Sequence, residues 1–206
     1  MKRNTALLTV AIAGLLNLFA MTADAADYAD PTWPCIQRKV ETLSPALMWS
    51  HPLPETPASK EESAAVDLMA ERLTLRRSDL ESLRPEVQAF AERYSGDPEV
   101  MGRVFQRAFK GLDTRRTRII KGIADFSLSQ IALAKSIENT RSEMDTQMAA
   151  DEPDFDRVDE LEEKLDWDQL IYSDRQKSIT YLCETPQLIE RRLFGIAQLL
   201  AEHVVD

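Results

Sequence analysis

The chain has 206 residues, of which 44% are hydrophobic and 29% are charged, and its formal net charge is -10 at pH 7. This length and composition fit one globular domain with a sizeable core. The acidic balance argues against nucleic acid as the main partner, because phosphate binding requires clustered positive charge.

The first 25 residues have the three parts of a cleaved export signal. Lys2 and Arg3 precede an apolar run over residues 6–20, which is shorter than the ~20 residues that cross a bilayer as a helix. Ala23 and Ala25 are the small residues that a signal peptidase requires. We therefore predict cleavage after Ala25 and a soluble periplasmic protein without a transmembrane anchor. An uncleaved anchor is the alternative.

Residues 26–58 are predicted to form an irregular arm that packs on a helical body. Six of the ten prolines lie between Pro31 and Pro57, and each proline removes an amide donor and restricts the residue before it. The segment also carries several large apolar residues, so we do not expect a free linker. A short helix is expected near Pro45 to Trp49.

The only two cysteines, Cys35 and Cys183, predict one disulfide that fixes this arm, because an exported protein meets an oxidising compartment. In the chain-entropy description, a loop of this length contributes at most about 5 kcal/mol of stability. Two buried free thiols and an intermolecular bridge are the alternatives.

Residues 59–206 are predicted to be an α-helical domain. Ser59 and Glu62 have the spacing of a capping box, and the sequence over 95–98, Ser-Gly-Asp-Pro, is typical of a helix break. Thr185 and Pro186 form a cap and first-turn pair. The apolar spacing predicts helices over residues 59–75, 80–94, 98–112, 113–148, 155–182 and 185–204.

The longest predicted helix, 113–148, contains no proline, and its apolar residues recur at a spacing of four then three. Gln130 and Thr140 interrupt that stripe, so it is not a strict coiled coil. Only a short acidic break separates it from the next helix, so the two should form an antiparallel hairpin over about 113–183. The predicted fold class is an all-α helical bundle with this hairpin and a proline-rich N-terminal arm.

Several apolar side chains are assigned to the packed faces of these helices by their spacing alone. On the helix from residue 155 the residues up to Leu165 are in register and further large apolar residues come after them, and on the last helix they recur every three or four residues. The side chains assigned to packed faces include Trp167, Leu170, Ile171, Leu188, Ile189 and Leu193, together with Phe90, Phe105, Phe109, Phe126 and Phe194.

A cluster of basic residues stands out in this acidic chain. Seven bases lie within residues 103–121, where Asp113 is the only acid. Such a patch can meet lipid phosphate, an acidic glycan or an acidic partner, or it can pair with acids of its own fold. The residues of this predicted interaction patch are Arg103, Arg107, Lys110, Arg115, Arg116, Arg118 and Lys121.

Candidate metal sites are weak. The predicted hairpin tip is rich in carboxylates, which calcium prefers, but the alternating spacing of a calcium loop is missing and acids are favoured at helix starts. His51 and His203 are the only histidines, too few for a typical zinc site. The acids of the tip are Asp145, Asp151, Glu152, Asp154, Asp156, Asp159, Glu160, Glu162 and Glu163.

The chain lacks a haem-attachment sequence, a glycine-rich phosphate loop and a nucleophile elbow. We therefore expect no cofactor and no catalytic residue. The favoured function is a noncatalytic periplasmic interaction, adaptor or chaperone-like protein that holds another envelope protein. The alternatives are a small-ligand or lipid carrier with an apolar cavity between the helices and the arm, and a hydrolase of envelope glycans or peptides that uses carboxylates.

Overall fold

The computed structural model describes residues 30–205, and this part of the chain is helical without a strand. The predicted leader, its cleavage after Ala25 and the first arm residues, 26–29, lie outside the described residues. The prediction of an all-α fold is confirmed. With η for a short 3-10 helix, the elements are η1 (Pro45–Leu47), α1 (Lys60–Thr74), η2 (Glu81–Leu83), α2 (Arg84–Arg93), α3 (Pro98–Met148) and α4 (Phe155–Ala201).

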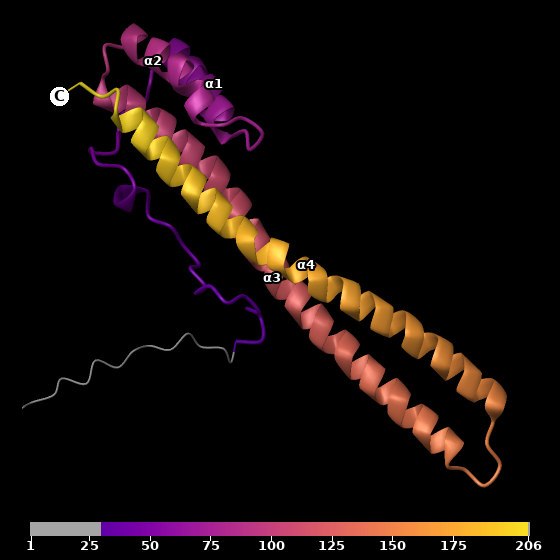
Figure 1. The fold of residues 1–206 in the computed structure, drawn as a ribbon. Helices are drawn as coiled ribbons and strands as arrows, with labels where there is room; N and C mark the ends of the chain where they lie inside the picture. The colour runs from indigo at the N-terminus through magenta and orange to yellow at the C-terminus, as the bar shows by residue number, and fades with distance from the viewer. Residues whose placement is uncertain (1–29, 206) are drawn as a thin grey trace, which may run out of the picture.

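The helices α3 and α4 form one long antiparallel hairpin, as predicted (Figure 1). Helix α3 has 51 residues and is therefore roughly 75 Å long. The turn between the helices is short, and the side chain of Asp154 caps α4 by accepting a hydrogen bond from the backbone N–H of Arg157 at 3.1 Å. The described part of the chain has no helix with an apolar stretch of the length that spans a bilayer.

The predicted helix boundary between residues 112 and 113 is wrong, because α3 runs through it. Leu112, Arg116 and Ile120 are all buried and are spaced by four residues, so one packed face continues across the predicted break. Gly111, the weakest helix former at this point, costs about 1 kcal/mol relative to alanine. The packing of the continuous face outweighs that cost.

The predicted start of a last helix at Thr185 is also wrong, because α4 continues from Phe155 to Ala201 with Pro186 inside it. Thr185 does not cap a helix. Its hydroxyl donates to the backbone carbonyl of Tyr181 at 2.8 Å, one turn back within the same helix. Pro186 is buried, so tertiary packing holds the helix together where the proline removes an N–H donor.

Replacing Pro186 with alanine should stabilise the protein by about 1 kcal/mol. The substitution restores the backbone donor that proline lacks, worth about 3 kcal/mol in a helix interior, but it also leaves a small void where the buried ring packs. Urea denaturation followed by circular dichroism measures the change. A clear loss of stability would mean that the packing of the ring matters more than the missing hydrogen bond.

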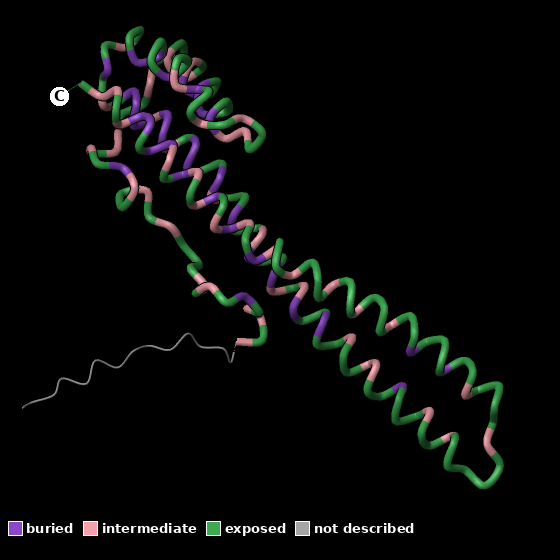
Figure 2. Tube along the Cα trace, in the orientation of Figure 1, coloured by how far each residue is buried: buried purple, intermediate pink, exposed green. Residues whose placement is uncertain are grey.

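The main hydrophobic core lies at one end of the hairpin, where α1 and α2 lie beside the first turns of α3 and the last turns of α4. Figure 2 shows buried residues concentrated at this end and a largely exposed surface at the other. We call the two ends the bundle end and the distal hairpin (residues 127–180). The largest fully buried apolar side chains of the bundle end are Leu73, Val87, Met101, Val104, Phe105, Leu112, Leu193, Ile196 and Leu200.

Local sequence signals fix the connections of the bundle end. Ser59 caps α1 by accepting a hydrogen bond from the N–H of Glu62 at 3.2 Å. Gly96 has φ +65° at the predicted break between α2 and α3, where a Cβ would come within 2.5 Å of Val205.

A tertiary hydrogen bond also ties α4 to the end of α1, because Arg192 of α4 donates to the carbonyl of Leu73 at 2.8 Å. Burial lowers the pKa of the Arg192 guanidinium.

Residues 30–59 follow the long helices from the middle of the hairpin back to the bundle end (Figure 1). Ser127 of α3 bonds the carbonyl of Pro31, and Gln106, six turns earlier on α3, bonds the carbonyl of Pro54 at 3.2 Å. The segment therefore runs antiparallel to α3. Its one helical turn is η1, after which Trp49 is buried and its ring stacks on Phe105 with centroids 5.3 Å apart.

Candidate interaction surfaces

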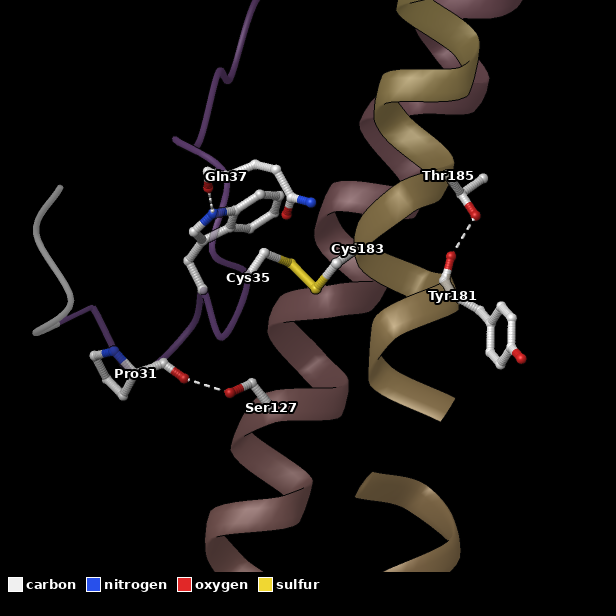
Figure 3. Close-up of a disulfide and its surroundings, with 8 residues drawn as sticks. Pro31, Cys35, Gln37, Ser127, Tyr181, Cys183 and Thr185 are labelled. Carbon is white, nitrogen blue, oxygen red and sulfur yellow. Dashed lines mark hydrogen bonds between the residues drawn. A yellow bond between two sulfur atoms is a disulfide. The ribbon is translucent and has the colours of Figure 1, made fainter. Parts of the chain in front are cut away.

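The disulfide joins Cys35 to Cys183 of α4, with an S–S distance of 2.03 Å and a Cα–Cα distance of 5.5 Å (Figure 3). Both cysteines are buried and pack with Ile123 of α3 in a small core of their own. Nearby, the hydroxyl of Ser127 donates to the carbonyl of Pro31 at 2.6 Å. The bridge therefore attaches the N-terminal segment to the hairpin close to the point where the distal hairpin begins.

The predicted basic patch does not form one surface, because Arg116 lies inside the protein with only 1% of its surface exposed. Its Nε donates to a carboxylate oxygen of Glu190 on α4 at 2.7 Å. The other guanidinium nitrogens donate to the backbone carbonyls of Val40 and Glu41. Arg116 thus joins the N-terminal segment, α3 and α4 through one side chain.

Two further members of the patch pair with acids of α1. The guanidinium of Arg103 bonds Glu62 at 2.6 Å and Glu99 at 2.8 Å, and Arg107 bonds Asp67 at 2.7 Å. With Lys110 these arginines line a hollow of about 480 Å³ between α3, α1 and residues 54–58. Its positive charge is largely neutralised by those carboxylates.

The rest of the patch is exposed on α3. Lys121 pairs with Asp125, one turn further along the helix, at 2.7 Å. Within the described chain, Lys110, Arg115 and Arg118 make no ion pair. No large hydrophobic residue is exposed on α3 between residues 98 and 127. Three bases without an apolar surface form a weaker docking site than the sequence indicates.

The candidate metal ligands do not converge. Among residues 30–205, no group of three or more His, Cys, Asp or Glu side chains is arranged to hold a metal ion. His51 lies beside Trp49, with ring centroids 5.5 Å apart, and His203 lies near the C-terminus against the 95–96 turn. The two histidines therefore lie in different parts of the bundle end.

The inward assignment of several side chains of α4 is wrong. Trp167, Leu170 and Ile171 are 59%, 53% and 41% exposed. Leu188 and Phe194, also assigned to a packed face, are exposed as well. The face of α4 that packs on α3 instead carries Leu161 and Leu165, and polar residues share the interface, since Gln130 and Thr140 of α3 are buried in it.

The exposed side chains share one face of the helix. Trp167, Leu170 and Ile171 lie at spacings of three and four residues, which places them side by side. Tyr181, four turns from Trp167, is 74% exposed, and its ring points away from the disulfide (Figure 3). We call the face that carries Trp167, Leu170, Ile171 and Tyr181 the outer face of α4.

Carboxylates lie around Trp167 on this face. Four of them line a shallow hollow of about 490 Å³ together with Trp167 and Leu170. Within residues 30–205, none of the four forms an ion pair, although neighbouring Asp168 and Glu160 do. The four carboxylates are Asp159, Glu162, Glu163 and Asp166.

A second, mainly apolar hollow of about 310 Å³ lies where the N-terminal segment meets the hairpin. Its walls come from residue 34, from α3 over 126–134 and from α4 over 172–179. This is the place where the sequence predicts a cavity for the alternative function of a carrier.

Comparison with known proteins gives no relative to transfer a function from. No protein-family model matches the chain, and neither a curated protein nor a solved structure is significantly similar to it. The function is therefore inferred from the surfaces described above.

Proposed function

We propose that the protein is a noncatalytic, exported adaptor or chaperone-like protein that binds another envelope protein through the distal hairpin. The proposal is carried by the outer face of α4, where three large apolar side chains lie together in contact with water. Contiguous exposed apolar residues on a soluble protein mark interaction sites. If these side chains were buried, they would contribute to the stability of the fold and would not be accessible to a partner.

The shape of the molecule supports the same function. The bundle end contains the main hydrophobic core, so the distal hairpin is not needed to complete it. An extended pair of helices with a firm base presents a long surface to a partner, as in helix-based recognition. The basic patch is the less favoured surface, because four of its seven residues pair with acids of the protein itself.

Export is supported by two features. The leader pattern of residues 1–25 is typical of a cleaved signal. The bridge between Cys35 and Cys183 is of the kind that forms and persists in oxidising compartments such as the periplasm.

Photo-crosslinking in intact cells tests the proposal. A photoreactive residue in place of Leu170 or Tyr181 should give one and the same discrete adduct with an envelope protein. The matched control places it at Leu68 of α1, an equally exposed apolar position at the bundle end, where the adduct should be absent. Adducts that do not differ between the two sites would contradict a docking role for the hairpin.

The carrier remains the second candidate because of the apolar hollow beside residue 34. Its volume suits a small apolar molecule. Native mass spectrometry of the gently purified protein should show an added mass if this is the function, and a ligand-free spectrum would count against it.

A further inference from the structure

The outer face of α4 also indicates the chemistry of its partner. Between Phe155 and Ile171 the sequence carries seven carboxylates and two bases, a net charge of -5. Both bases, Arg157 and Lys164, are already paired with carboxylates. The apolar side chains of Trp167 and Leu170 therefore lie in a strongly negative field.

The unpaired carboxylates are spread out and do not meet at one point. Asp159 and Asp166 are seven residues apart, which corresponds to about 10 Å along a helix. They do not form a group that can hold a metal ion. Carboxylates at this separation fit several positive groups carried by one chain better than a single ion.

Trp167 adds a preference for a particular kind of cation. An exposed indole face attracts a lysine or arginine side chain, whose charged group interacts with the ring while its aliphatic stem covers apolar surface. The carboxylates of Glu163 and Asp166 line the same hollow as the indole. The hollow thus combines the apolar surface and the negative charge that one basic side chain requires.

A second copy of the chain fits poorly. Two outer faces brought together would place like charges against each other, which is destabilising. The basic residues of α3 could pair with the carboxylates, but no large apolar side chain is exposed among them to cover Trp167. An anionic lipid surface is disfavoured for the same reason of charge.

Building on the function proposed above, we propose that the outer face of α4 between Asp159 and Ile171 binds a cationic amphipathic segment of a partner polypeptide, with a lysine or arginine side chain over the ring of Trp167. The apolar side of that segment covers Leu170 and Ile171, and its positive charges face the four unpaired carboxylates.

Fluorescence anisotropy with synthetic peptides and the purified, oxidised chain tests the proposal. The probe is a labelled amphipathic helix of lysine and leucine, and it should bind in about 0.05 M salt and weaken strongly in about 0.5 M salt, since screening removes the attraction. One control peptide replaces leucine with serine at the same charge, and another replaces lysine with glutamate. Both should bind much more weakly than the probe.

Variants of the protein localise the binding. Trp167→Ala should weaken binding of the probe about tenfold, whereas Phe194→Ala, at an equally exposed aromatic of α4, should leave it unchanged. Neutralising the four carboxylates (D159N/E162Q/E163Q/D166N) should weaken binding at least tenfold and flatten its salt dependence. The matched control, E61Q/E71Q/E138Q/D145N, removes the same charge from exposed sites elsewhere.

The outcomes separate this inference from the proposed function. Equal binding by both quadruple variants, or equal binding of the serine peptide, would overturn the cationic amphipathic partner. The proposal would also be overturned by a dimer in sedimentation that depends on Trp167, or by full displacement of the probe by spermidine at low concentration. A hairpin-specific adduct in cells, combined with no binding of the probe, would leave the adaptor function standing with a partner of different chemistry.

Discussion

Replacing Arg116 with methionine is expected to lower the free energy of unfolding by about 3 kcal/mol or more. Arg116 is almost completely buried and pairs with Glu190 at 2.7 Å. Removal of one member of a buried ion pair costs about 3–5 kcal/mol, because the other charge loses its partner. Glu190 retains some contact with water, so we expect the lower part of this range.

The same substitution should also loosen the N-terminal segment. The carbonyls of Val40 and Glu41 lose their donor when Arg116 is removed, and unpaired polar groups at a packed contact favour hydration and opening. Urea denaturation measures the stability, and amide hydrogen exchange over residues 36–43 measures the opening. Arg115→Met is the control, since Arg115 is exposed and surface changes of this kind stay within about 0.5 kcal/mol. Equal effects of the two variants would contradict the role of Arg116.

The helices were predictable where local signals determine them. The cap at Ser59 and the helix break at Gly96 depend on a few neighbouring residues, and the structure has both. Of the predicted capping box only the Ser59 half forms, because the carboxylate of Glu62 pairs with Arg103. The helix ends at Leu112 and Thr185 were predicted wrongly because local signals are weak there and packing decides. Pro186 is tolerated inside α4 because its buried ring contributes to the packing of the helix.

The fate of the basic patch could not be predicted from its composition. Arg103, Arg107 and Arg116 find carboxylates that lie 41, 40 and 74 residues away in sequence. Only the tertiary fold brings these charges together, so a cluster counted along the chain overstates the exposed charge. The disulfide was predictable because the chain contains only two cysteines, which leaves one intramolecular pairing.

The outer face of α4 was missed although the sequence contains a signal for it. Val158, Leu161, Leu165 and Tyr172 continue the alternating spacing of three and four residues that a packed hairpin requires, with Asp168 at the position between the last two. Trp167, Leu170 and Ile171 fall outside this register. A helix with apolar residues both on and off its packing register carries two apolar faces, and the second is available to a partner.

Removing the disulfide by C35S/C183S is expected to lower the free energy of unfolding by about 2–5 kcal/mol. The bridge spans 148 residues, and closing a loop of this length restricts the unfolded chain strongly. Urea denaturation of the oxidised wild type, the reduced wild type and the double variant measures the effect. The reduced wild type and the double variant should agree, and reductant should not change the double variant.

The loss should be local in the native state, because the N-terminal segment is also attached to the hairpin at points other than the bridge. Cys35 holds its first part, Arg116 binds Val40 and Glu41, and Trp49 is buried in the main core.

Without the bridge, hydrogen exchange should rise over residues 30–38, while Trp49 keeps the emission of a buried indole. Exposure of Trp49 on reduction would show instead that the bridge holds the whole segment, and an unchanged unfolding midpoint would show that the loop contributes little. Loss of the bridge should leave the outer face of α4 unaffected, since Trp167 is not among the residues that pack around the disulfide.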